Sequence, residues 1–246
     1  VEKITELKPE LIVVAAFGQI IPKDILDVPK YKSINIHGSM LPKLKGASPV
    51  QYAILEGYEK TGVTIMIMDE LMDHGPILTQ QEIELDKKET SETLFKRMSP
   101  IGANLLMATL PDWISGKLQP QEQNHEEATL TKIISKEDGK IIWSETAEKI
   151  ERQIRAFNPW PGTFCLFKDQ SGNEKRLKIL DADVADCKEI ADNNFGYLHS
   201  DDKNNLLVNT GKNCLKLNKV QPEGKNPMNA QEFLNGYAFL SNTYLE

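Results

Sequence analysis

Three residues able to donate hydrogen bonds or to transfer protons lie between positions 35 and 73: Asn35, His37 and Asp73. Asn35 and His37 alternate with isoleucines, which predicts a short strand with an amide and an imidazole together on one face. Gly38 follows this strand and Gly75 follows Asp73, so a ligand could approach the backbone closely at both places. Such a trio can donate hydrogen bonds to a developing negative charge and accept a proton.

Each of these residues also has an ordinary structural interpretation. An Asn-x-His pair on a strand is commonly a surface pair or a hydrogen-bonded core pair. Asp73 stands where a turn aspartate would be unremarkable. No covalent nucleophile is indicated, because Ser39 and Ser48 lack a nucleophile-elbow motif.

The elements that must position the trio read as an α/β domain. Residues 11–17 form a continuous apolar run, which predicts a central parallel strand covered on both faces. Residues 63–69 predict a second strand that ends just before Asp73, and residues 90–116 predict a helix. Alternating strands and helices favour an α/β sheet, in which ligands bind beyond the carboxyl ends of the strands.

The second half of the chain reads differently. We predict a catalytic domain over residues 1–117, a linker over 118–140 and a second domain over 141–246. A helix with its inner face at Ala147, Ile150 and Ile154 opens this domain, and short strands at regular spacing then predict a small barrel. The predicted strands are residues 163–167, 176–184, 196–199, 205–208 and 213–220.

Composition limits the classes of function. The 246 residues carry a net charge of −7, most of it in the first half, which makes general nucleic-acid binding unfavourable. RNA would need a local basic patch in the near-neutral second half. Cys165, Cys187 and Cys214 are scattered and lack metal-ligand spacing, so we expect free thiols, a reducing compartment and no metal site. No apolar run approaches the length of a membrane span.

Four motifs carry a resemblance to a known family. They are A-F-G-Q-I-I-P at 16–22, I-N-I-H-G-S-M-L-P at 34–42, T-G-V-T-I-M-I-M-D at 61–69 and R-A-F-N-P-W-P at 155–161. Together they span nearly the whole chain, which resembles the folate-dependent formyltransferase family. The resemblance implies a Rossmann-like parallel-sheet domain followed by a small barrel of the OB type.

The resemblance also implies an activity. It is transfer of a formyl group from 10-formyltetrahydrofolate to the α-amine of methionyl initiator tRNA, by a cytoplasmic or organellar-matrix enzyme that we expect to be a monomer with no membrane partner. Asn35, His37 and Asp73 would be catalytic, and Asp73 could also hold His37 protonated. Ser39, Met40, Leu41, Pro42 and Phe17 would bind the folate.

The resemblance is incomplete in four places. Met40 stands where the family usually has Leu, a volume-conserving change, and Lys45 stands where Arg is common. His74 and Pro76 also differ from the commonest residues of their loop. Relative to the family, about two or three strands at the start of the domain are expected to be absent. If that is real, activity should be weak or lost.

The same residues are also compatible with other functions. The same chemistry could act on another amine, such as an amino sugar, or on water as a 10-formyltetrahydrofolate hydrolase. The chain could also be a non-catalytic folate-binding or RNA-binding fragment. Trp160 could pack between domains or stack on a nucleotide. Phosphate contacts would fall on basic residues of the second half: Arg152, Arg155, Lys175, Arg176 and Lys178.

Overall fold

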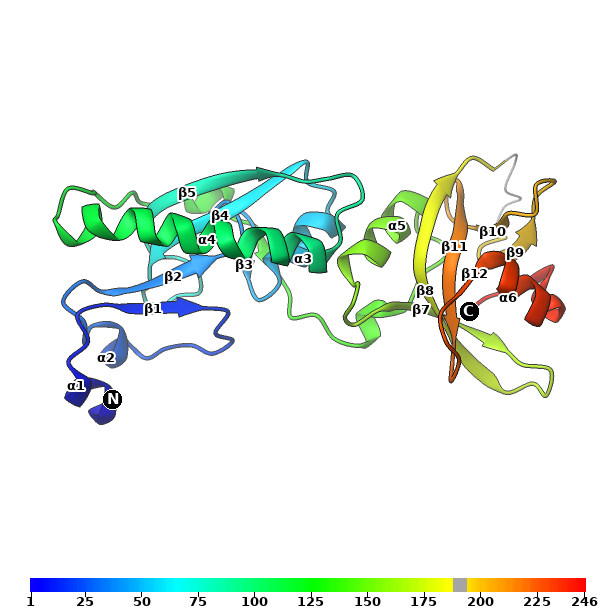
Figure 1. Cartoon of the computed structure of the whole chain (residues 1–246), viewed down its shortest axis with the longest axis horizontal. Coiled ribbons are helices and arrows are strands. Elements are labelled where there is room, and N and C mark those ends of the chain that lie inside the picture. Colours follow the sequence, from blue (N-terminus) through cyan, green and yellow to red (C-terminus); the bar gives the residue numbers. More distant parts are fainter. Residues whose placement is uncertain (188–193) are drawn as a thin grey trace. The chain divides into compact units, whose positions relative to one another are not determined.

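The computed structural model describes residues 1–187 and 194–246. The chain folds as two compact units, residues 1–133 and 134–246 (Figure 1). The boundary falls inside the segment predicted as the linker, but residues 118–133 belong to the first unit. Within the described residues, no helix is long and apolar enough to cross a membrane.

The first unit is an α/β unit built on a four-stranded sheet, in the order β1-β2-β4-β5. β1 and β2 run parallel, whereas β4 is antiparallel to both β2 and β5. The predicted α/β class is confirmed, and within this sheet the parallel pairing is confined to β1 and β2. The elements of the sheet and its helices are α1 (Glu2–Leu7), β1 (Ile12–Ala15), α2 (Lys23–Leu26), β2 (Ser33–His37), α3 (Pro49–Leu55), β4 (Lys60–Ile67), β5 (Ile77–Glu84) and α4 (Ser91–Ile114).

β1 differs from its prediction as a central strand covered on both faces. It is the edge strand of this sheet, and of its four residues only Val14 is buried, while Val13 is 43% exposed. A continuous apolar run fits a central strand, but the exposure of each face depends on what packs against it, which the run itself does not encode.

The face of the sheet that carries Ile34 and Ile65 forms the core, where both side chains are fully buried. α4 packs against β4 and β5. A glycine permits close contact here, because a Cβ on Gly102 would lie 3.1 Å from Ile36 Cγ2. α4 begins with a capping box at Thr90 and runs without interruption through Pro100.

Residues 118–133 return to the first unit and extend it. β6 (Leu130–Thr131) pairs in parallel with β3 (Lys45–Gly46), and the backbone of Gln121 pairs with that of Ile77. A short 3-10 turn, η1 (His125–Glu127), lies between these two pairings. The segment is therefore a structural part of the first unit.

The second unit is an antiparallel sheet with the order β13-β9-β10-β11-β8-β7, and β12 pairs with β11. Backbone hydrogen bonds between Glu246 and Leu166 join the residues after β13 to β7, so the sheet forms a nearly closed barrel. All five predicted strands are confirmed. The elements are η2 (Glu137–Gly139), α5 (Ala147–Ala156), β7 (Thr163–Lys168), β8 (Glu174–Ala185), β9 (Tyr197–Ser200), β10 (Leu206–Asn209), β11 (Cys214–Pro222), β12 (Met228–Asn229), α6 (Ala230–Gly236), η3 (Ala238–Leu240) and β13 (Thr243–Tyr244).

The cysteines differ from their prediction. Cys187 and Cys214 form a disulfide with a Cα–Cα distance of 5.6 Å, so the expectation of three free thiols was wrong for these two. Cys187 follows the end of β8 and Cys214 begins the neighbouring strand β11, so strand pairing brings together residues that are far apart in the sequence. Cys165 is a free thiol, and burial raises its pKa.

Candidate functional site

β2 presents Asn35 and His37 on the face opposite its isoleucines. The strand lies between β1 and β4, where Asn35 is opposite Met66 and His37 is opposite Thr64. His37 is buried with 5% of its surface exposed, and Asn35 is half-buried. Pairing with β1 and β4 therefore fixes the position of β2 on both sides. Its two polar side chains project from one face, as the alternating pattern predicted.

Asp73 reaches the same place from the loop between β4 and β5. One carboxylate oxygen, Oδ2, accepts a 2.7 Å hydrogen bond from the backbone N–H of Gly46. The other, Oδ1, lies 3.5 Å from Asn35 Nδ2 and 3.5 Å from His37 Nδ1. Asp73 has a backbone φ of +49°, a left-handed conformation that aspartate tolerates better than most residues. The structure thus brings the three predicted catalytic residues together.

The state of His37 follows from its second nitrogen. Nε2 lies 3.0 Å from the carbonyl oxygen of Leu44, and a carbonyl only accepts, so Nε2 carries a proton. Burial lowers the pKa of His37, outweighing the opposing effect of the Asp73 charge. In the neutral imidazole with its proton on Nε2, the lone pair of Nδ1 lies on the side of Asp73. Desolvation therefore opposes the expectation that Asp73 holds His37 protonated, which stays a prediction.

Gln123 is a site residue that the sequence analysis missed. Its buried amide donates hydrogen bonds to the backbone oxygens of Asp73, at 3.0 Å, and Gly75, at 2.7 Å. The loop bends tightly here, since a Cβ on Gly75 would lie 2.1 Å from the oxygen of Ile67. Gln123 thus holds both ends of the turn that carries Asp73. It stands in a polar segment without periodicity, so no sequence signal marked it.

Lys45 places a cationic group close to Asp73. The residue is only 4% exposed, and its Nζ lies 3.3 Å from His125 Nδ1. Burial lowers the pKa of Lys45, while the charges of Asp73 and Asp69 act in the opposite direction. The ring of His125 stacks on His74 at a centroid distance of 4.0 Å. Lys45 therefore packs within a polar cluster beside the trio.

The segment predicted to line the folate site continues from β2 with mixed exposure. Ser39 and Leu41 are buried, whereas Met40 and Pro42 are partly exposed. Thr64 Oγ1 donates to the oxygen of Ser39 and accepts from the N–H of Leu41, at 2.6 and 3.2 Å. The segment is thus a rigid wall, and Met40 and Pro42 are the members that retain surface for a ligand.

Phe17 lies just beyond the end of β1, with 56% of its surface exposed. Ala15 pairs with Ile36 in the parallel register, so the chain leaves β1 and β2 at the same edge of the sheet. Phe17 is therefore on the edge from which the Ser39–Pro42 segment also starts. That edge carries the carboxyl ends of both strands, where ligands bind in open α/β sheets.

The predicted phosphate-binding residues of the second unit fall into two groups. Arg155 pairs with Glu151 at 2.8 Å along α5, and both side chains are largely buried. On β8, Arg176 and Lys178 are exposed on the face opposite the buried Leu177. The guanidinium of Arg176 also lies over the ring of Phe164 at 3.8 Å. β8 therefore offers the exposed pair of charges.

Comparisons of the sequence with known proteins identify the same family in both units. A formyl transferase family model matches residues 1–110, and a formyl transferase C-terminal domain model matches residues 133–238. A methionyl-tRNA formyltransferase from Bacillus thuringiensis (strain Al Hakam) is 42% identical over 236 residues, which cover 96% of this chain and 73% of that protein. One from Bacillus cytotoxicus is 42% identical over 239 residues, with the same coverage.

Solved structures share the fold. The crystal structure of HypX from Aquifex aeolicus in complex with tetrahydrofolic acid matches 98% of this chain and 41% of that protein, with a TM-score of 0.66 and 17% identity. The sugar 3N-formyl transferase WlaRD matches 90% of this chain and 77% of its own, with a TM-score of 0.62 and 23% identity. With both domain models, the 42% identical relatives and the assembled trio, the chain belongs to the formyl transferase family, in its methionyl-tRNA formyltransferase branch.

Proposed function

We propose that this protein transfers the formyl group of 10-formyltetrahydrofolate to the α-amine of methionyl-tRNA, with Asn35, His37 and Asp73 as its catalytic residues. The observation that carries the proposal is the position of Asp73 Oδ1, 3.5 Å from both Asn35 Nδ2 and His37 Nδ1. The extended similarity to methionyl-tRNA formyltransferases supports the choice of acceptor.

The reaction begins when the neutral α-amine attacks the formyl carbon. A carbon–nitrogen bond forms, the carbonyl oxygen becomes an oxyanion and the amine nitrogen becomes positively charged. The Asn35 amide donates a hydrogen bond toward that oxygen, and removing one such donor typically costs about 10²–10³-fold in rate. The backbone N–H of Gly46 fixes the carboxylate of Asp73, and this carboxylate orients the Asn35 amide.

The amine must then lose a proton, and Nδ1 of His37 takes it, directly or through a water molecule. The neutral ring with its proton on Nε2 is in the correct state to do so. The neighbouring Asp73 carboxylate stabilises the imidazolium that forms. His37 returns the proton to N10 of the folate as the bond between N10 and the formyl carbon breaks. The products are formyl-methionyl-tRNA and tetrahydrofolate.

The donor would bind at the carboxyl edge of β1 and β2. A pterin is flat and apolar on its faces, so an exposed aromatic ring and partly exposed apolar side chains suit it. Phe17, Met40 and Pro42 have these properties. The side chains of Ser39 and Leu41 are buried, so these residues would contribute through their backbone. The hydroxyl of Thr64 fixes that backbone by bonding to the oxygen of Ser39 and the N–H of Leu41.

The test is transfer of labelled formyl from 10-formyltetrahydrofolate to methionyl-tRNA, compared with a reaction without acceptor. We expect labelled formyl-methionyl-tRNA from the wild-type chain, and a loss of about 10²–10⁴-fold in the His37→Ala variant, the range for acid–base groups. Met107→Ala is the control, since this side chain on α4 is exposed and lies outside the trio.

The other outcomes separate the remaining functions. Release of labelled formate without acceptor labelling would replace the proposal with a hydrolase. Labelling of an amino sugar but not of tRNA would replace the acceptor. Binding of the folate without turnover in any assay would favour the non-catalytic alternative. Full transfer by the His37→Ala variant would overturn the catalytic assignment.

A further inference from the structure

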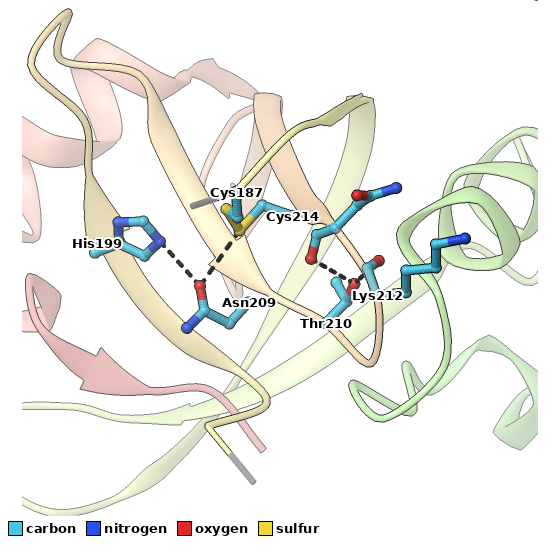
Figure 2. Close-up of a disulfide and its surroundings, with 7 residues drawn as sticks. Cys187, His199, Asn209, Thr210, Lys212 and Cys214 are labelled. Atoms are coloured by element: carbon cyan, nitrogen blue, oxygen red, sulfur yellow. Dashed lines mark hydrogen bonds between the residues drawn. A yellow bond between two sulfur atoms is a disulfide. The ribbon is translucent and has the colours of Figure 1, made fainter. Parts of the chain in front are cut away.

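Outside the proposed catalytic site, one cluster among the described residues has the chemistry of a metal site. Cys187, His199 and Cys214 place their ligand atoms within 4.8 Å of one another in the second unit. Figure 2 shows the imidazole and the two sulfur atoms converging on the side chain of Asn209. The cluster is remote in sequence from Asn35, His37 and Asp73, and formyl transfer makes no use of it.

Neighbouring strands of the barrel hold these residues in place. His199 is on β9, Asn209 ends β10 and Cys214 begins β11, directly opposite Asn209. Cys187 follows the end of β8, where Ala185 pairs with Cys214. Thr210 closes the turn between β10 and β11 by donating to the oxygens of Lys212 and Asn213, at 2.7 and 3.0 Å. His199 and Cys214 therefore project from paired strands, and Cys187 from the segment that follows β8.

A disulfide alone does not account for this arrangement. His199 Nε2 lies 3.0 Å from Asn209 Oδ1, and Cys214 Sγ lies 3.3 Å from the same oxygen. Two of the three candidate ligands thus contact one oxygen, and the third, Cys187, is bonded to Cys214. Cys214 and Asn209 are buried, whereas Cys187 and His199 are partly exposed, which leaves a path for an ion.

The dimensions suit a small tetrahedral cation. Zinc bonds of about 2.3 Å to sulfur and about 2.0–2.1 Å to nitrogen require ligand atoms about 3.6–3.8 Å apart. The ligand atoms of the cluster already lie within 4.8 Å of one another. To reach the zinc geometry, the two sulfur atoms that are now bonded must mainly move apart. Asn209 Oδ1 or a water molecule would complete the fourth position.

We propose that Cys187, His199 and Cys214 bind Zn²⁺ when the Cys187–Cys214 disulfide is reduced, so that this end of the barrel is held either by a disulfide or by a metal ion. Reduction by a phosphine consumes one water molecule and yields the phosphine oxide and two thiols. Binding of Zn²⁺ then displaces the two thiol protons, forming two zinc–sulfur bonds and one zinc–nitrogen bond. The ion would tie the end of β8 to β9 and β11, as the disulfide does.

The experiment uses Co²⁺ as a spectroscopic substitute for Zn²⁺ on the full chain, after reduction with a phosphine under anaerobic conditions. We expect one equivalent of Co²⁺ to give sulfur-to-cobalt charge-transfer absorption and the visible bands of a tetrahedral site. Zn²⁺ should displace the Co²⁺ and abolish both. The oxidised protein should give neither, because its sulfurs are bonded to each other.

Variants identify the ligands. Cys187→Ser should abolish the charge-transfer bands, and His199→Gln should weaken Co²⁺ binding at least tenfold while retaining them. Cys165→Ala is the control that should change nothing, since this thiol lies in the barrel core and outside the cluster. Because Cys187 is only partly buried, its variant should fold, which circular dichroism will verify.

A second readout does not depend on spectroscopy. Zn²⁺ should raise the melting temperature of the reduced wild-type chain and of Cys165→Ala, and leave that of Cys187→Ser unchanged, because binding to the native state stabilises it. Absence of charge-transfer bands in the reduced protein, their persistence in Cys187→Ser, or equal Co²⁺ binding by the oxidised protein would each overturn the proposal. None of these results depends on formyl transfer.

Discussion

The backbone N–H of Gly46 donates a 2.7 Å hydrogen bond to Asp73 Oδ2. This contact leaves Oδ1 facing Asn35 and His37. Gly46 adopts a left-handed backbone conformation, with a φ of +107°, which other residues rarely adopt. It also lies so close to Thr131 that there is no room for a side chain. The orientation of the only carboxylate in the trio therefore depends on a residue with no side chain.

A methyl group at position 46 should damage both stability and activity. A Cβ there would lie 2.8 Å from the backbone oxygen of Thr131, in a conformation that residues other than glycine rarely adopt. We expect Gly46→Ala to lower the free energy of unfolding by about 1–3 kcal/mol, measured by urea denaturation. Gly236→Ala is the control, because nothing lies within 4 Å of the added methyl. Equal stability of the two variants would contradict this account of Gly46.

Removing the amide of Gln123 should misplace Asp73 without removing any member of the trio. Gln123→Ala deletes two buried hydrogen bonds, to the oxygens of Asp73 and Gly75. Small displacements of catalytic groups can cost up to about 10²-fold in rate, so we expect kcat to fall by at least about tenfold. KM for methionyl-tRNA should change little. Gln121→Ala, at an exposed side chain two residues away, should behave as wild type. A rise in KM with kcat unchanged would instead indicate a role in binding.

The titration of His37 can be measured directly by NMR. Because burial lowers its pKa, we expect a value below about 6.5, the ordinary value for histidine. Asp73→Asn removes the charge that partly opposes this shift, so the pKa should fall further. A pKa above the ordinary value, or a rise in Asp73→Asn, would contradict the neutral state assigned to His37.

The same shift predicts how stability depends on pH. The unfolded chain protonates His37 at a higher pH than the folded chain does, so the folded state loses stability as the pH falls below about 6.5. The loss should level off below the folded-state pKa. A His37→Gln variant should lack this contribution, which denaturation at a series of pH values will show as a shallower decline on the acid side.

Binding of tRNA should depend on the exposed charges of β8. We expect Arg176→Glu combined with Lys178→Glu to weaken methionyl-tRNA binding and to reduce the slope of log K against log salt by about 1–2, as for the loss of two phosphate contacts. Lys3→Glu with Lys8→Glu makes the same charge change on exposed residues of the first unit. Equal effects of the two pairs would show that only net charge matters.

Much of the fold could be predicted because its signals are local. The alternation in β2 placed Asn35 and His37 on one face, and the turn spacing of the second half marked the five strands of the barrel. The apolar run of β1 did not reveal an edge strand, since exposure depends on neighbouring elements rather than on the run itself.

The support of the site could not be predicted, for reasons that are also physical. Gly46 acts through a backbone N–H, which every residue except proline has, so its role leaves no mark in the sequence. Gln123 lies in a segment with no periodicity and meets Asp73 only through the tertiary fold. Cys187 and Cys214 meet through the pairing of β8 with β11, which their spacing does not reveal.

The parallel pairing of β3 with β6 has a consequence for how the protein is made. Asp73 and Gly46 are both synthesised well before Gln123 and Thr131, and 58 residues separate Asp73 from Thr131. At about 5–20 residues per second, a ribosome needs about 3–12 s to add them. During that interval the nascent chain contains the whole trio without the strand and the amide that hold its loops. Assembly of the candidate catalytic site therefore waits until Thr131 has been added, shortly before synthesis of the barrel begins.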